Sequence, residues 1–189
     1  MDVLRGPGGY DGQKSADVDN YPAGNAFAGA IAAMEILTKE MVRLGAQATD
    51  KTDAIKQSGE LLVQAGCVAP AYVDGMLARE RVMSNYLGTG VAIPHGEFKD
   101  LALVRRTGVS VLQLPGGVEW EPGEKAYLVV GLAARSDELA SILQNLLDVL
   151  QDPATVERLA RTTDPMVIVE RLVGSPAESQ ANTRNGTPF

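Results

Sequence analysis

One histidine, His95, carries most of the chemistry that this sequence can offer. It is the only histidine among 189 residues, and it lies between Pro94 and Gly96. The apolar run Val91-Ala92-Ile93 precedes it, and Pro94 cannot donate to a sheet ladder, so the pattern predicts a strand that ends at a sheet edge. Imidazole titrates near neutral pH and can act as a nucleophile, and a glycine leaves room for an anion beside it. The pattern indicates a histidine presented for chemistry, although a solitary histidine is more often an ordinary surface or core residue.

The composition is typical of a globular cytoplasmic protein. Charged residues make up 22% of the chain and apolar residues 45%, and no uninterrupted apolar stretch approaches the roughly 20 residues of a membrane helix. The net charge of −7 argues against a general nucleic-acid binder, which would carry a basic face. The single Cys67 cannot form an internal disulfide. One cysteine and one histidine offer no metal-ligand set, so we expect neither a metal nor a cofactor.

Predicted strands and helices alternate along the chain. Apolar patterns predict strands over 36–44, 108–114 and 126–134, the last of them buried and central. Pro115-Gly-Gly117 is expected to end the second strand, which leaves Trp120 in a polar loop. Helices are predicted over 50–64, from about Pro70, from Ser136, and after each of the pairs Asp152-Pro153 and Asp164-Pro165. Such alternation predicts a three-layer α/β domain.

The chain divides into one domain and two extensions. Residues 1–35 have weak periodicity and are interpreted as a flexible extension or linker, and residues 175–189 as a disordered tail. The domain between them, 36–174, contains a leucine-rich helical stripe that begins at Leu139 and ends at Leu150. An intramolecular core face is a commoner role for such a stripe than a dimer seam.

A long segment around His95 resembles a known family. The residues that carry the resemblance are Tyr72-Val-Asp-Gly-Met-Leu-Ala-Arg-Glu-Arg81, Tyr86-Leu-Gly and Ala92-Ile-Pro-His-Gly96, followed by Gly131-Leu-Ala-Ala134. Over about 36–174 the chain resembles the enzyme IIA domain of the bacterial sugar phosphotransferase system, mannitol/fructose type. The resemblance implies a mixed sheet with helices on both faces, and a phosphoryl group carried on His95.

The resemblance also implies partners and a second site residue. His95 would accept the phosphoryl group from the histidine of the carrier protein HPr and pass it to a cysteine of an enzyme IIB domain, upstream of a membrane IIC transporter. Arg79 matches the arginine beside the phosphorylated histidine, and a guanidinium fork suits phosphate oxygens. Alternatively, Arg79 lies on a solvent-exposed helix face and has no role in the site. For Arg81 this second interpretation is preferred. Backbone N–H groups near Gly88–Gly90 or Gly96 are further candidate donors, although such loops are more often plain turns.

One departure from the family pattern concerns Leu139. The family usually carries a second histidine at this position, and leucine can neither donate a hydrogen bond nor share positive charge. Glu138 and Asp137 would repel a phosphate unless they face away, and Arg135 is a speculative replacement donor. Three functions therefore stay open: an active phosphocarrier, a regulatory module that accepts phosphate slowly, and a degenerate domain that acts by protein contact alone.

Overall fold

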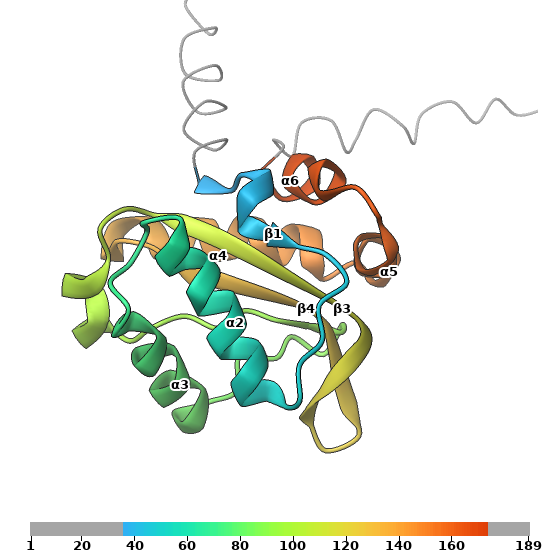
Figure 1. Cartoon of the computed structure of the whole chain (residues 1–189), viewed down its shortest axis with the longest axis horizontal. Helices are drawn as coiled ribbons and strands as arrows, with labels where there is room; N and C mark the ends of the chain where they lie inside the picture. Colours follow the sequence, from blue (N-terminus) through green and yellow to red (C-terminus); the bar gives the residue numbers. More distant parts are fainter. Residues whose placement is uncertain (1–35, 174–189) are drawn as a thin grey trace, which may run out of the picture.

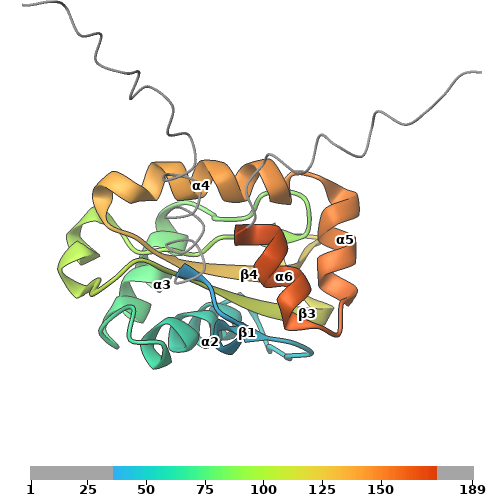
Figure 2. The ribbon, with the colours of Figure 1, turned by 90° about the horizontal axis from the view of Figure 1, so that it is seen from above.

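The computed structural model describes residues 36–173, which form a sheet between two groups of helices (Figure 2). Helices α2 (Lys51–Gln64) and α3 (Tyr72–Val82) lie on one side of the sheet (Figure 1). On the other side lie α4 (Ser136–Leu150) and α5 (Pro153–Arg161), and α6 (Pro165–Val173) packs on α4 and beside the first strand. The predicted three-layer α/β architecture is confirmed. The predicted extension 1–35 and tail 175–189 lie outside the described residues.

The sheet is mixed and its two long strands form its centre. Strand order is β1-β3-β4-β2, with β1 parallel to β3, β3 antiparallel to β4, and β4 parallel to β2. The strands are β1 (Val42–Arg43), β2 (Val91–Ala92), β3 (Gly108–Glu121) and β4 (Glu124–Ala133). Both edge strands are only two residues long, which limits the backbone that an edge presents. The predicted edge strand before Pro94 is therefore confirmed as β2.

Local signals placed several elements correctly. Asp50 occupies the N-cap of α2 and accepts a hydrogen bond from the Asp53 N–H at 2.8 Å. Asp152 caps α5 in the same way through the Thr155 N–H. Strand β4 is buried from Leu128 to Ala133, as its continuous apolar run predicts for a strand covered on both faces.

Two predicted strands differ from the structure. The segment predicted as a strand over 36–44 contains a 3₁₀ helix, Lys39–Met41, before the two-residue β1, because the charged pair Lys39-Glu40 breaks the alternation a strand needs. Strand β3 does not end at Pro115-Gly-Gly117 but continues to Glu121, with a register shift against β4 between Gln113 and Val118. A bulge tolerates a proline because the extra residues make no ladder bonds. Trp120 consequently lies in β3, only 2% exposed, and not in a polar loop.

Helix α4 uses its leucine stripe inside the molecule. Leu146 and Leu150 are buried in the core, while Leu139 and Leu143 are partly buried and pack against it. The helix begins at Ser136, so the N-cap is Arg135 and not the predicted Ser136. Within residues 36–173, no helix combines the length and the apolar character that a membrane span requires.

Candidate functional site

The sheet places His95 at the carboxyl end of β2. Val91 and Ala92 pair with Leu128 and Val129 of β4, and the pairing extends past Pro94, whose carbonyl accepts the Leu132 N–H at 3.0 Å. His95 forms an isolated bridge with Leu132. The imidazole is partly buried, beside the last residues of the central strand. A ring that lines the end of a sheet while keeping some exposure can meet a group brought from outside.

A backbone hydrogen bond determines which ring nitrogen of His95 is free. Nδ1 lies 2.9 Å from the Ile93 carbonyl oxygen. A carbonyl can only accept, so the proton of the neutral ring resides on Nδ1 and the Nε2 lone pair is free. Burial is the largest cause that lowers the pKa of His95, and the hydrogen bond to Ile93 opposes it. The Arg79 charge lowers the pKa further, and the Glu80 charge raises it. With its pKa held below the usual 6.5, the ring is neutral and nucleophilic at pH 7.

Gly96 makes room for a tyrosine rather than for an anion. Its N–H donates to the Tyr72 hydroxyl at 2.9 Å, and that hydroxyl donates to the Leu132 carbonyl at 3.0 Å. A Cβ at Gly96 would lie 2.7 Å from Cε2 of Tyr72. The expectation that Gly96 offers space and an N–H to a ligand is therefore wrong. Tyr72 is the site residue that sequence reasoning missed, because its contact with Gly96 spans 24 residues.

The glycines before β2 form a turn remote from the ring. Gly88 and Gly90 have φ of 82° and 85°, the left-handed region that favours glycine. The Gly90 N–H donates to the Tyr86 hydroxyl, and its carbonyl accepts from Tyr127. Gly90 precedes His95 by five residues, a distance of about 16 Å in extended chain, so the positive φ angles and the bonds of Gly90 favour the plain-turn interpretation over a phosphate-binding role.

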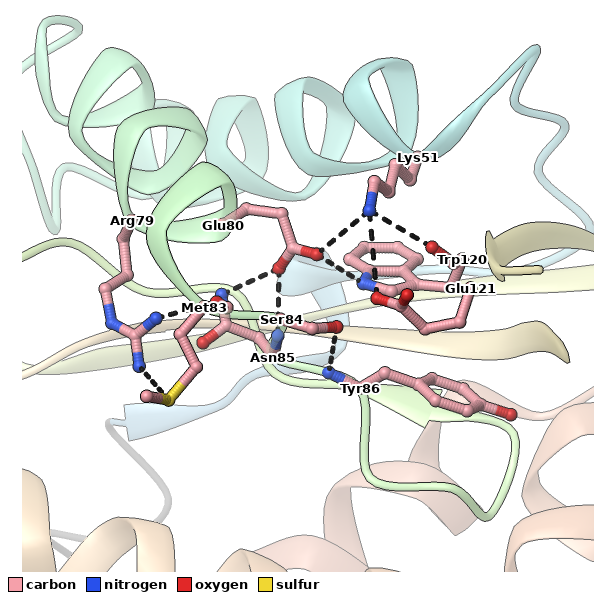
Figure 3. A network of polar contacts seen from close by, with 9 residues as sticks. All are labelled: Lys51, Arg79, Glu80, Met83, Ser84, Asn85, Tyr86, Trp120 and Glu121. Atoms are coloured by element: carbon pink, nitrogen blue, oxygen red, sulfur yellow. Dashed lines mark hydrogen bonds and ion pairs between the residues drawn. The ribbon is translucent and has the colours of Figure 1, made fainter.

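Arg79 lies in the last turn of α3, where its guanidinium contacts Met83. Nη1 donates to the Met83 carbonyl oxygen at 2.7 Å, and Nη2 contacts Met83 Sδ at 3.9 Å (Figure 3). A guanidinium has five N–H donors, so these contacts leave others for an anion. Burial of the ring is the main cause that lowers the pKa of His95, and the Arg79 charge lowers that pKa further. Arg81, by contrast, is exposed, as predicted for a solvated face.

The position of the missing second histidine is structural in this chain. Leu139, in the first turn of α4, is partly buried and packs against the core. The neighbouring Glu138 carboxylate accepts a hydrogen bond from the Thr107 hydroxyl. The partner of this carboxylate is therefore Thr107, and not His95 or Arg79. The side chain of Asp137 lies outside the described residues. Arg135 is exposed and its carbonyl accepts the Leu139 N–H, so nothing in its contacts assigns it a donor role.

Residues 36–173 contain no group of three or more His, Cys, Asp or Glu side chains arranged to hold a metal ion. The candidate site therefore consists of one neutral imidazole with a free Nε2, the backbone and tyrosine that hold it, and one arginine whose charge lowers the pKa of the imidazole. A nucleophile paired with a cation suits the transfer of an anionic group.

Comparison with known proteins shows the family to which this chain belongs. Residues 35–173 match the family model described as phosphoenolpyruvate-dependent sugar phosphotransferase system, EIIA 2. The chain belongs to this family. The crystal structure of IIA mannitol from Escherichia coli superposes with a TM-score of 0.68 at 40% identity, covering 72% of this chain and 98% of that one. The EIIA family resemblance and its mixed-sheet fold are thus confirmed.

Longer proteins also contain an EIIA segment similar to this chain. The multiphosphoryl transfer protein of Rhodobacter capsulatus is 50% identical over 156 residues, which cover 79% of this chain and 19% of that protein. The mannitol-specific EIICBA component of Escherichia coli strain K12 is 41% identical over 140 residues, or 73% of this chain and 22% of that protein. The chain therefore spans about a fifth of the length of these relatives.

Proposed function

We propose that this EIIA domain is a phosphocarrier that accepts a phosphoryl group on Nε2 of His95 and passes it on. The donor is phosphorylated HPr, and the acceptor is the cysteine of an enzyme IIB domain that serves sugar uptake of the mannitol type. One observation carries the proposal: the 2.9 Å contact between Nδ1 and the Ile93 carbonyl, which leaves the Nε2 lone pair unprotonated. Family membership supports the same chemistry.

The transfer requires no proton to move. The Nε2 lone pair forms a bond to phosphorus as the donor's N–P bond breaks, and the electron pair of that bond returns to the donor ring, which leaves as neutral imidazole because its other nitrogen already carries a proton. The Nδ1 proton stays directed at the Ile93 carbonyl, whose partial negative charge stabilises the positive ring that results. Since the attacking and leaving atoms must lie in line, positioning supplies most of the catalysis.

Arg79 is the proposed phosphate clamp. In the transition state negative charge spreads over three equatorial oxygens, which a guanidinium can bind in a bidentate manner. Its present partner, the Met83 carbonyl oxygen, carries no net charge, so a negatively charged phosphate oxygen attracts the guanidinium more strongly. Arg79 is thus held near the ring at rest and engages the phosphoryl group as it arrives.

Exposed apolar side chains near the site suit protein partners. Phe98 is 82% exposed and follows His95 by three residues, while Val82 and Met83 are 75% and 64% exposed at the end of the helix that carries Arg79. Isolated exposed apolar side chains are common on protein surfaces, and it is their position close in sequence to both His95 and Arg79 that suits a partner surface here. We assign HPr and the IIB domain to this surface, in the cytoplasm. A relative at 40% identity, IIA mannitol, has been solved in complex with phosphorylated IIB mannitol.

The proposal is tested with phosphoenolpyruvate, enzyme I, HPr and this chain. We expect an acid-labile, base-stable phosphate on wild-type protein and none on the His95→Ala variant. Equal labelling of the two proteins would place the acceptor elsewhere. Retained labelling of HPr in both reactions controls for the supply of donor.

Leu139 favours a second candidate, a regulatory module that accepts phosphate slowly and acts through its contacts. Leucine supplies no donor to the phosphoryl oxygens, and loss of one such donor costs roughly 10²–10³ in rate. Addition of a matched IIB domain separates the candidates. A phosphocarrier transfers its labelled phosphate to IIB at a rate fast enough to support sugar uptake. A regulatory module keeps the labelled phosphate when IIB is added.

A further inference from the structure

The buried carboxylate of Glu80 lies between the site and three other parts of the chain. Its side chain is 4% exposed. Oε2 accepts two hydrogen bonds from Asn85, from the backbone N–H at 3.0 Å and from Nδ2 at 2.9 Å. Oε1 accepts one from Trp120 Nε1 at 2.9 Å and one from Lys51 Nζ at 3.5 Å (Figure 3). Glu80 therefore connects α3, the loop after it, strand β3 and the start of α2.

Asn85 continues this connection to the imidazole. The Asn85 carbonyl accepts the Ile93 N–H at 3.0 Å, and the Ile93 carbonyl is the partner of His95 Nδ1 at 2.9 Å. Ile93 is thus held at both of its backbone groups. Asn85 is itself only 7% exposed, and two of its hydrogen bonds end on the same carboxylate oxygen. The position of that oxygen therefore affects the carbonyl that selects the tautomer of His95.

We propose that Glu80 is a positioning residue for phosphoryl transfer, which holds Asn85 and Ile93 so that His95 keeps its proton on Nδ1 and directs Nε2 outward. The inference rests on the proposed function of His95. Because Glu80 follows Arg79 directly in α3, the same carboxylate also fixes the helical turn from which the guanidinium extends. One anchor thereby aligns the two groups that must meet the phosphoryl group.

The chemistry of the anchor requires a carboxylate. All four groups around Glu80 are donors, and an ionised carboxylate is a pure acceptor. Glutamine would present an NH₂ to donors at one of the two oxygen positions, leaving an unpaired contact in the interior. The charge is balanced by Lys51, which also bonds to the Trp120 carbonyl at 3.1 Å and lies 3.8 Å from Glu121.

The main test compares Glu80→Gln with Glu121→Gln, which removes the other carboxylate beside Lys51 but leaves Asn85 untouched. We expect Glu80→Gln to slow single-turnover transfer from phosphorylated HPr by about 10- to 100-fold, as when partners that orient a metal-binding histidine are removed. The KM for HPr stays unchanged, because Glu80 is buried and cannot touch a partner. Glu121→Gln transfers at the wild-type rate.

A spectroscopic readout separates positioning from general stability. With ¹⁵N-labelled histidine, the single imidazole of the protein reports its tautomer directly. We expect wild-type His95 to be protonated on Nδ1 alone, and Glu80→Gln to show a mixture of both tautomers. A folded Glu80→Gln with the wild-type rate and a single tautomer would overturn the proposal.

Two milder variants keep the test decisive if Glu80→Gln does not fold. Asn85→Ala and Trp120→Phe each remove one donor to Glu80, but only Asn85 lies on the path to His95. We expect the tautomer mixture and slower transfer in Asn85→Ala and neither in Trp120→Phe; equal behaviour of the two variants would refute the positioning role. Wild-type protein that accepts no phosphate would contradict the proposed function, while the tautomer comparison would still test Glu80.

Discussion

Replacement of Arg79 by alanine should separate transition-state stabilisation from stability. The side chain makes two contacts, to the carbonyl and the sulfur of Met83, and Met83 is 64% exposed. Water can replace a hydrogen bond at such a position, so the free energy of unfolding should fall by no more than about 1 kcal/mol. Transfer loses a charged donor to the equatorial oxygens, which costs roughly 10²–10³ in rate, or about 3–4 kcal/mol of activation free energy.

The assay is single-turnover transfer of labelled phosphate from HPr, with chemical denaturation of the same samples. Arg81→Ala is the matched control, because Arg81 is an exposed arginine two residues further along the same helix. Arg79→Lys keeps the charge but loses the planar fork, and its rate should lie between those of wild type and Arg79→Ala. Removal of the Arg79 charge should also raise the pKa of His95. A wild-type rate in Arg79→Ala, or an equal loss in Arg81→Ala, would refute the clamp.

Three further predictions concern the residues around the ring. Leu139→His should speed single-turnover transfer by up to about 10²-fold, because histidine restores a hydrogen-bond donor to the phosphoryl oxygens. An unchanged rate would show that residue 139 takes no part in the transfer. Gly96→Ala should lower the free energy of unfolding in urea by about 1–3 kcal/mol, since its Cβ would lie 2.7 Å from the Tyr72 ring; equal stability would contradict that packing. Because the folded-state pKa of His95 lies below 6.5, the unfolded chain binds more protons in acid, so stability should fall as pH drops from about 6.5 through the folded pKa. His95→Gln should abolish this part of the pH dependence, and an identical pH profile would show that another group causes it.

Local sequence patterns were sufficient to place His95 at the end of a strand and to predict most of the layers. Pro94 ends a short apolar run, so the position of His95 at a strand end could be predicted without any distant contact. The caps Asp50 and Asp152 act on N–H groups three residues away, within the range of a local pattern. The proposed role of Arg79 came from the resemblance to a family, because no spacing rule links this residue to His95.

The errors concern contacts that tertiary structure alone creates. The role of Gly96 was misread because Tyr72, 24 residues earlier, fills the space that a glycine leaves. Pro115 was taken as a strand end, yet pairing with β4 on both sides of a bulge carries the strand past it. Trp120 was placed in a loop for the same reason, and its bond to Glu80 joins residues 40 positions apart. None of these contacts leaves a periodic trace in the sequence.

The most direct test of the account is the identity of the phosphorylated atom. Protein labelled with ¹⁵N-histidine and phosphorylated through HPr contains a single imidazole, so ³¹P–¹⁵N coupling reports which nitrogen bears phosphorus. We predict coupling to Nε2 of His95, with the proton retained on Nδ1. Coupling to Nδ1, or stable phosphate on a residue other than His95, would contradict the account.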